Sequence, residues 1–134
     1  MISINSIMYY GRSFDVQYDW WFCLEDERVY SSDEMRLLFG FSNEDQIIES
    51  GVFLKLFKTD IPSLKKLFVK NYPYHKLEKM ITAICNQEKV DFNVAFNICA
   101  ETAPFRFDWF SFEKQQLESD AVSWCESNGL PYIN

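Results

Sequence analysis

The stretch "VQYDWWFCLEDERVYSSDEMRLLFG", residues 16–40, contains two strand-like segments followed by a helix-like segment. Residues 16–24 and 28–31 are rich in aromatic and β-branched side chains, and the acidic turn "EDE" separates them. This pattern predicts two antiparallel strands joined by a short turn. Residues 3–10 have a similar composition, so we expect them to add a strand and complete a short β-meander.

The end of the same stretch carries the signals of a helix start and a helix stop. Ser31 or Ser32 precedes acidic residues that suit the first helical turn, and Gly40 follows the last apolar residue. Ser42 and Gly51 bracket a second short helix in the same way. The chain therefore changes from strands to helices soon after residue 31.

A second strand-to-helix change follows. Side chains in residues 52–57 alternate between two faces well enough for a strand. From Asp60 onward the spacing of the apolar residues becomes helical, and Asp60 can cap this helix, with Pro62 in its first turn. Four helices are expected, the last over residues 111–128 with its stop at Gly129. The residues expected to face the core are Leu64, Leu67, Phe68, Leu77, Met80, Ile81, Ile84, Phe92, Ala95, Phe96, Cys99, Leu117, Ala121, Trp124 and Cys125.

These elements predict a single α+β domain over residues 1–134, with a small N-terminal antiparallel β-meander packed against C-terminal amphipathic helices. The chain has 134 residues, of which 48% are hydrophobic and 18% aromatic, which is enough apolar material for one core. Its first residues lack the pattern of a secretory signal, and its apolar runs are too short to span a membrane. We expect a cytoplasmic protein; its oligomeric state is left open.

Motifs for metal, cofactor or phosphate chemistry are absent from the sequence. The four cysteines, Cys23, Cys85, Cys99 and Cys125, form no CxxC pair and sit among apolar neighbours, so we expect all four to be buried, reduced and structural. His75 is the one histidine of the chain, at an expected helix start, and cannot form a multi-histidine site. No metal and no cofactor is predicted. An enzyme that uses Cys23, or the clustered acids Glu25–Glu27 and Asp33–Glu34, in a cleft is kept as an alternative.

Charge is distributed unevenly along the chain, whose formal net charge is −7. Residues 24–50 hold eight acids against two arginines, whereas residues 55–89 hold eight lysines against three acids. An acidic segment with neighbouring aromatics suits a basic protein partner, and the net charge argues against general nucleic-acid binding. Weak RNA contact through the lysine-rich segment 55–89, in a housekeeping or regulatory protein, is a further alternative.

The closing segments, "WFSF" at 109–112 and "WCESNG" at 124–129, resemble the W-x-x-F and W-C-E-x-N-G blocks of a widespread uncharacterised (UPF-type) family of bacterial proteins. The resemblance implies an α+β fold and a cytoplasmic bacterial setting, and it implies no activity. The chain departs from the arginine-rich stretch of that family at residues 91–97, "DFNVAFN".

The function expected from the sequence is that of a non-catalytic acidic protein-interaction domain. A stoichiometric inhibitor, or an immunity protein against a basic partner such as a nuclease toxin, fits this description. Of the adjacent Trp20 and Trp21, one is expected to point inward and the other to be exposed as a partner anchor. The candidate partner-binding residues are Trp20, Trp21, Glu25, Asp26, Glu27, Asp33 and Glu34.

Overall fold

The computed structural model describes residues 1–13, 19–73, 76–101 and 105–134, and it shows the predicted α+β class. The chain divides into two compact units, which we call unit 1 (Met1–Thr59 with Leu117–Asn134) and unit 2 (Asp60–Gln116). The expectation of a single domain stays a prediction. His75 lies outside the described residues.

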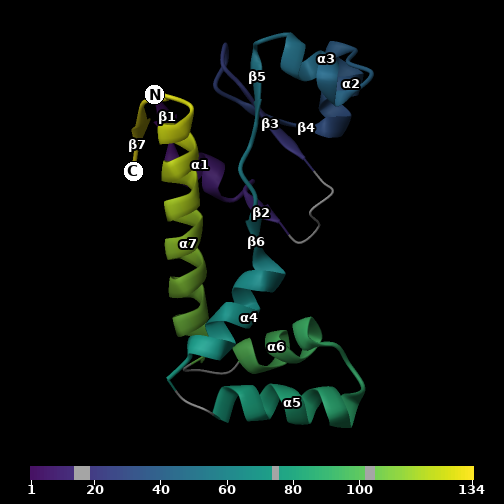
Figure 1. The fold of residues 1–134 in the computed structure, drawn as a ribbon, viewed down its shortest axis with the longest axis vertical. Coiled ribbons are helices and arrows are strands. Elements are labelled where there is room, and N and C mark those ends of the chain that lie inside the picture. Colours follow the sequence, from purple (N-terminus) through teal and green to yellow (C-terminus); the bar gives the residue numbers. More distant parts are fainter. Residues whose placement is uncertain (14–18, 74–75, 102–104) are drawn as a thin grey trace. The chain divides into compact units, whose positions relative to one another are not determined.

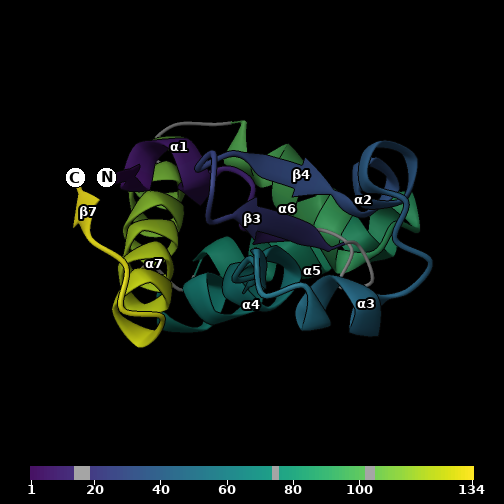
Figure 2. The ribbon, with the colours of Figure 1, turned by 90° about the horizontal axis from the view of Figure 1, so that it is seen from above.

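Unit 1 contains a three-stranded antiparallel sheet in the order β4-β3-β5 (Figure 1). Figure 2 shows two of these strands, β3 and β4, side by side. Trp21, on the central strand, lies opposite Tyr30 on one side and Lys55 on the other. The antiparallel hairpin of the sheet was predicted. The third strand comes from residues 53–55 and not from residues 3–10, so the sheet is not the expected meander. The strands are β3 (Trp20–Cys23), β4 (Val29–Ser31) and β5 (Phe53–Lys55).

The predicted strand over residues 3–10 is wrong, because most of this segment forms a short helix, α1 (Ile4–Met8). Ile4, Ile7 and Met8 are buried with the i, i+3, i+4 spacing of one helical face. Their core also contains Leu56 and Leu117. Short strands β1 (Ile2–Ser3) and β7 (Tyr132–Ile133) of unit 1 pair in parallel. Strand β2 (Arg12–Ser13) pairs with β6 (Thr59–Asp60), which contains the last residue of unit 1 and the first of unit 2.

The two helices that follow the hairpin are fixed by local caps, as the sequence predicted. In α2 (Ser32–Phe39), Ser31 and Glu34 form a reciprocal capping box, and Gly40 ends the helix with a φ of 74°. Asn43, one residue after the predicted cap, accepts a hydrogen bond from Gln46 N and so caps α3 (Glu44–Glu49).

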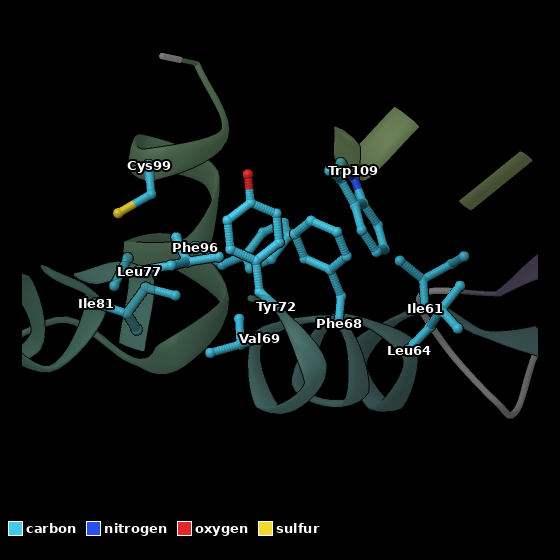
Figure 3. Packing of buried hydrophobic residues seen from close by; sticks show 11 residues of the cluster. Ile61, Leu64, Phe68, Val69, Tyr72, Leu77, Ile81, Phe96, Cys99 and Trp109 are labelled. Atoms are coloured by element: carbon cyan, nitrogen blue, oxygen red, sulfur yellow. The ribbon is translucent and has the colours of Figure 1, made fainter. Parts of the chain in front are cut away.

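Unit 2 has an aromatic-rich core, shown in Figure 3. Leu67 and Met80, both expected in this core, are 46% and 39% exposed. On the first helix the buried face follows Leu64, Lys65 and Phe68, so Leu67 is turned away from it. The helices are α4 (Ile61–Asn71), capped by Asp60 as predicted, α5 (Lys76–Glu88), α6 (Phe92–Ala100) and α7 (Phe105–Ser127).

Helix α7 starts six residues earlier than predicted and contributes to both cores. Trp109 belongs to the core of unit 2, whereas Leu117, Ala121 and Cys125 are buried in unit 1. The helix ends before Gly129, whose φ of 65° confirms the predicted stop.

Trp124, expected in the core, is half-buried and acts as a link between α7 and β5. Its indole Nε1 donates a hydrogen bond to Lys55 O at 3.0 Å, and its ring packs edge-to-face on Phe22 with centroids 5.6 Å apart. A hydrogen bond to a backbone carbonyl gives the side chain a structural role that burial alone does not describe.

We predict that Trp124→Ala lowers the free energy of unfolding by about 3 kcal/mol, the lower end for a truncated aromatic, because the ring is only half-buried. Trp124→Phe keeps a ring against Phe22 but loses the hydrogen bond, so it should cost about 1 kcal/mol. Urea denaturation of both variants measures the two contributions. Equal losses for alanine and phenylalanine would show that ring packing contributes nothing.

The four cysteines are reduced, and three are buried as predicted: Cys23, Cys99 and Cys125. Cys85 is only half-buried, which corrects the expectation for that residue. Burial raises the pKa of the Cys99 and Cys125 thiols, which lowers the fraction present as reactive thiolate at neutral pH.

We therefore predict that one thiol of the native protein, Cys85, reacts before the others with a thiol reagent. The buried three should react at least about 100-fold more slowly, as a local opening free energy of about 3 kcal/mol would produce. Mass spectrometry of the modified protein assigns the site, and Cys85→Ser should abolish the fast phase. A fast phase that persists in Cys85→Ser would contradict the burial of the other three.

Candidate protein-interaction surface

The first three acidic candidates, Glu25, Asp26 and Glu27, occupy the turn between β3 and β4, and all three are exposed. The turn is closed by backbone hydrogen bonds, with Cys23 N donating to Arg28 O at 2.8 Å and Glu27 N donating to Cys23 O at 2.9 Å. Glu27 has a φ of 57°, the left-handed conformation that lets the chain reverse here. The hairpin therefore presents three carboxylates at its tip.

Asp26 is held in place by two hydrogen bonds within the hairpin. The Tyr30 hydroxyl donates to its Oδ2 atom, and Arg28 N donates to its Oδ1 atom at 2.9 Å. The bond from Tyr30 is the main reason that the pKa of Asp26 lies below its ordinary value, and the same bond raises the pKa of Tyr30. Asp26 is thus a fixed, ionised group in the turn.

The remaining acidic candidates, Asp33 and Glu34, lie in the first turn of α2. Glu34 Oε1 accepts from Ser31 N at 2.9 Å, so this carboxylate is used by the capping box. Asp33 forms an exposed ion pair with Arg36, at 3.4 Å. Asp33 is therefore the better placed of the two for a partner, since an exposed pair of this kind is weak and easily exchanged.

Trp20 and Trp21 point to opposite faces of the sheet, as their adjacent strand positions require. Trp21 is 2% exposed, in a core with Met35 and Ile47. Trp20 packs against the other core of unit 1 and meets the Tyr10 ring edge-to-face at 5.0 Å. The expectation of one exposed tryptophan is not met, because Trp20 is half-buried.

Sequence reasoning missed the exposed apolar residues at the end of α2. Leu37, Leu38 and Phe39 are 75%, 64% and 43% exposed. The signal was present in the sequence: three consecutive apolar residues on a short helix point in directions about 100° apart, so they cannot all face one core.

Tyr30 connects these apolar residues to the acidic turn. Its hydroxyl binds Asp26, and its ring packs edge-to-face on Phe39 with centroids 5.2 Å apart. Carboxylates and exposed apolar side chains thus belong to neighbouring elements of unit 1. We call this set the acidic–apolar surface; it consists of Glu25, Asp26, Asp33, Leu37, Leu38 and Phe39.

The alternative of an enzyme that uses Cys23 would need this thiol to be accessible in a cleft. Cys23 is buried, so its sulfur is not presented in an open cleft. Within residues 1–13, 19–73, 76–101 and 105–134, no group of histidine, cysteine and acidic side chains could hold a metal ion. None of the described helices combines the length and apolar character that a membrane crossing requires.

At least three of the eight lysines in segment 55–89 interact with other described residues of the protein. Lys55 pairs with Glu44 at 2.6 Å, Lys58 pairs with Asp19 at 2.5 Å, and Lys65 is buried. The segment therefore offers less positive charge to RNA than its composition indicates.

The chain matches no protein-family model, no curated protein and no solved structure at a significant level. The resemblance of its closing segments to the uncharacterised bacterial family stays an expectation.

We predict that Tyr30→Phe raises the pKa of Asp26 towards its ordinary value, because the variant keeps the ring on Phe39 but removes the donor. A pKa lowered by folding contributes stability above about pH 4, and the contribution is lost as the pH falls through the folded-state value. The variant should therefore be less stable than the parent at neutral pH, and the difference should disappear in acid.

Carboxyl-carbon NMR titration of Asp26 measures the shift, and denaturation at neutral and acidic pH measures the stability difference. Tyr132→Phe is the matched control, because it removes a tyrosine hydroxyl that donates to a different carboxylate, that of Glu126, at 2.8 Å. An unchanged Asp26 titration in Tyr30→Phe would show that the hydroxyl does not hold the carboxylate.

Proposed function

We propose that this chain is a non-catalytic protein-interaction domain that binds a basic protein partner through its acidic–apolar surface. A stoichiometric inhibitor, such as an immunity protein against a basic nuclease toxin, is the function that fits this chemistry best. The observation that carries the proposal is the exposure of Leu37, Leu38 and Phe39 on α2, a helix that Phe39 joins to Tyr30, the residue whose hydroxyl binds Asp26 of the acidic turn.

Apolar and charged groups have different roles in such an interface. Apolar side chains at the centre lose contact with water on binding and slow dissociation, whereas charges around them steer the partner and speed association. Asp33 is an exposed acid on the same helix as the apolar group, and Glu25 is an exposed acid in the neighbouring hairpin turn; acids of this kind favour a partner with a lysine- or arginine-rich patch.

The test uses a partner captured from the source lysate, purified, and measured for binding kinetics at about 50 and about 300 mM salt. Glu25→Lys with Asp33→Lys should slow association about 10-fold or more at low salt and flatten its salt dependence. Asp26 and Glu34 are left intact because their carboxylates hold the turn and the helix cap.

Leu37→Ser with Leu38→Ser should increase the dissociation rate about 10-fold or more with little change in association. Glu88→Lys, an exposed acid on α5, is the matched charge control and should leave both rates unchanged. If the partner is a toxin, titration should abolish its activity at one molecule of this chain per molecule of toxin. An acidic partner, or rates that none of these variants alters, would refute the proposal.

A further inference from the structure

Unit 2 contains an open cleft between α4 and the first part of α7, with a volume of about 340 Å³. Phe68, Asn71 and Tyr72 line it from α4, and Asp108 and Phe112 line it from α7. The spacing on α4 is i, i+3, i+4 and that on α7 is i, i+4, so each helix presents one face to the cleft. The volume lies within the range of small-molecule sites.

The floor of the cleft is aromatic. The Phe68 ring lies 5.0 Å from that of Tyr72 and 5.4 Å from that of Phe112, measured between centroids. Figure 3 shows Tyr72 and Phe68 next to each other on the same helix. Phe68 and Tyr72 are buried in the core of unit 2, and Phe112, which is partly buried, packs against the same core.

A carboxylate stands at the rim of this aromatic floor. The Tyr72 hydroxyl donates to Asp108 Oδ2 at 2.5 Å, which ties the carboxylate to one of the aromatic residues of the lining, and Asp108 is itself exposed. The other polar residues of the rim are neutral, among them Asn71 and Gln115. No lysine or arginine is among the described lining residues, so the cleft has no group that would neutralise a phosphate or a carboxylate.

From this combination we infer that the cleft binds a small organic cation, an alkylammonium compound. Ring faces attract a cation through their quadrupole, a carboxylate supplies the opposite charge, and the alkyl groups of the ligand pack on the aromatic floor. The site lies entirely within unit 2 and shares no residue with the acidic–apolar surface, so it is independent of the proposed protein partner.

The experiment titrates the whole chain with tetramethylammonium chloride and follows binding by calorimetry and by backbone amide NMR. We expect saturable binding with shifts at residues 68–73 and 105–116. Neopentyl alcohol, an uncharged compound of similar shape, should bind at least about 10-fold more weakly. Equal affinity for the two compounds would reduce the site to an apolar cleft and overturn the inference.

Two variants test the residues. Asp108→Asn removes the charge but keeps an oxygen that can accept from Tyr72, so the fold is retained and affinity should fall about 10-fold. Phe112→Leu keeps an apolar side chain without a ring and should also weaken binding, with circular dichroism to verify folding. Glu88→Gln removes a charge elsewhere in unit 2 and should change nothing. Unchanged affinity in Asp108→Asn, or tighter binding of inorganic phosphate, would refute the assignment.

Discussion

Helix α7 is the constraint on which the rest of the structure depends, because its side chains belong to both hydrophobic cores. Its buried residues follow one another at intervals of four: Trp109, Glu113, Leu117, Ala121 and Cys125. A step of four residues turns the helix by about 40° more than a full turn, so the buried stripe winds by about 160° over this length. The buried stripe does not stay on one face of α7: its first residues belong to the core of unit 2 and its last residues to a core of unit 1.

Sequence analysis recovered only the second half of this helix, from the apolar residues Leu117, Ala121 and Cys125. The same interval of four continues backwards to Trp109, but it passes through Glu113, a charged residue that is buried and that an apolar pattern does not include. Caps were easier to predict, because Ser31 with Glu34, Asp60 and Gly129 act through contacts within a few residues of themselves. Such caps depend on residues within about one helical turn, so they can be predicted from the sequence.

Residues 3–10 show the opposite case, in which the local signal was misleading. Their β-branched residues favour a strand, but Ile4, Ile7 and Met8 also have helical spacing, and burial against Leu56 and Leu117 decides between the two. Both partners are far away in the sequence. The place of the third strand in the sheet depends on similar long-range contacts, which composition and period do not contain.

The acidic character of the candidate site could be predicted from the sequence, but the hydrogen bonds and ion pairs that each charged side chain forms could not. Glu34 serves a helix cap and Asp26 serves the hairpin, which leaves Glu25 and Asp33 as the acids best placed for a partner. On the basic side, Lys65 is buried, with its ammonium donating to Asn93 Oδ1 at 2.6 Å and to Asn97 Oδ1 at 3.0 Å.

Lys65 also lies over the Phe96 ring, at 5.3 Å from its centroid, so the positive charge is stabilised inside unit 2 instead of being presented to solvent. Lys55 and Lys58 are similarly tied to carboxylates of unit 1. Pairing within the protein therefore takes up part of the lysine-rich segment, while the acids of the hairpin tip and of the start of α2 remain at the surface. The hairpin and the start of α2 therefore keep exposed carboxylates, whereas much of the positive charge of the lysine-rich segment is used inside the protein.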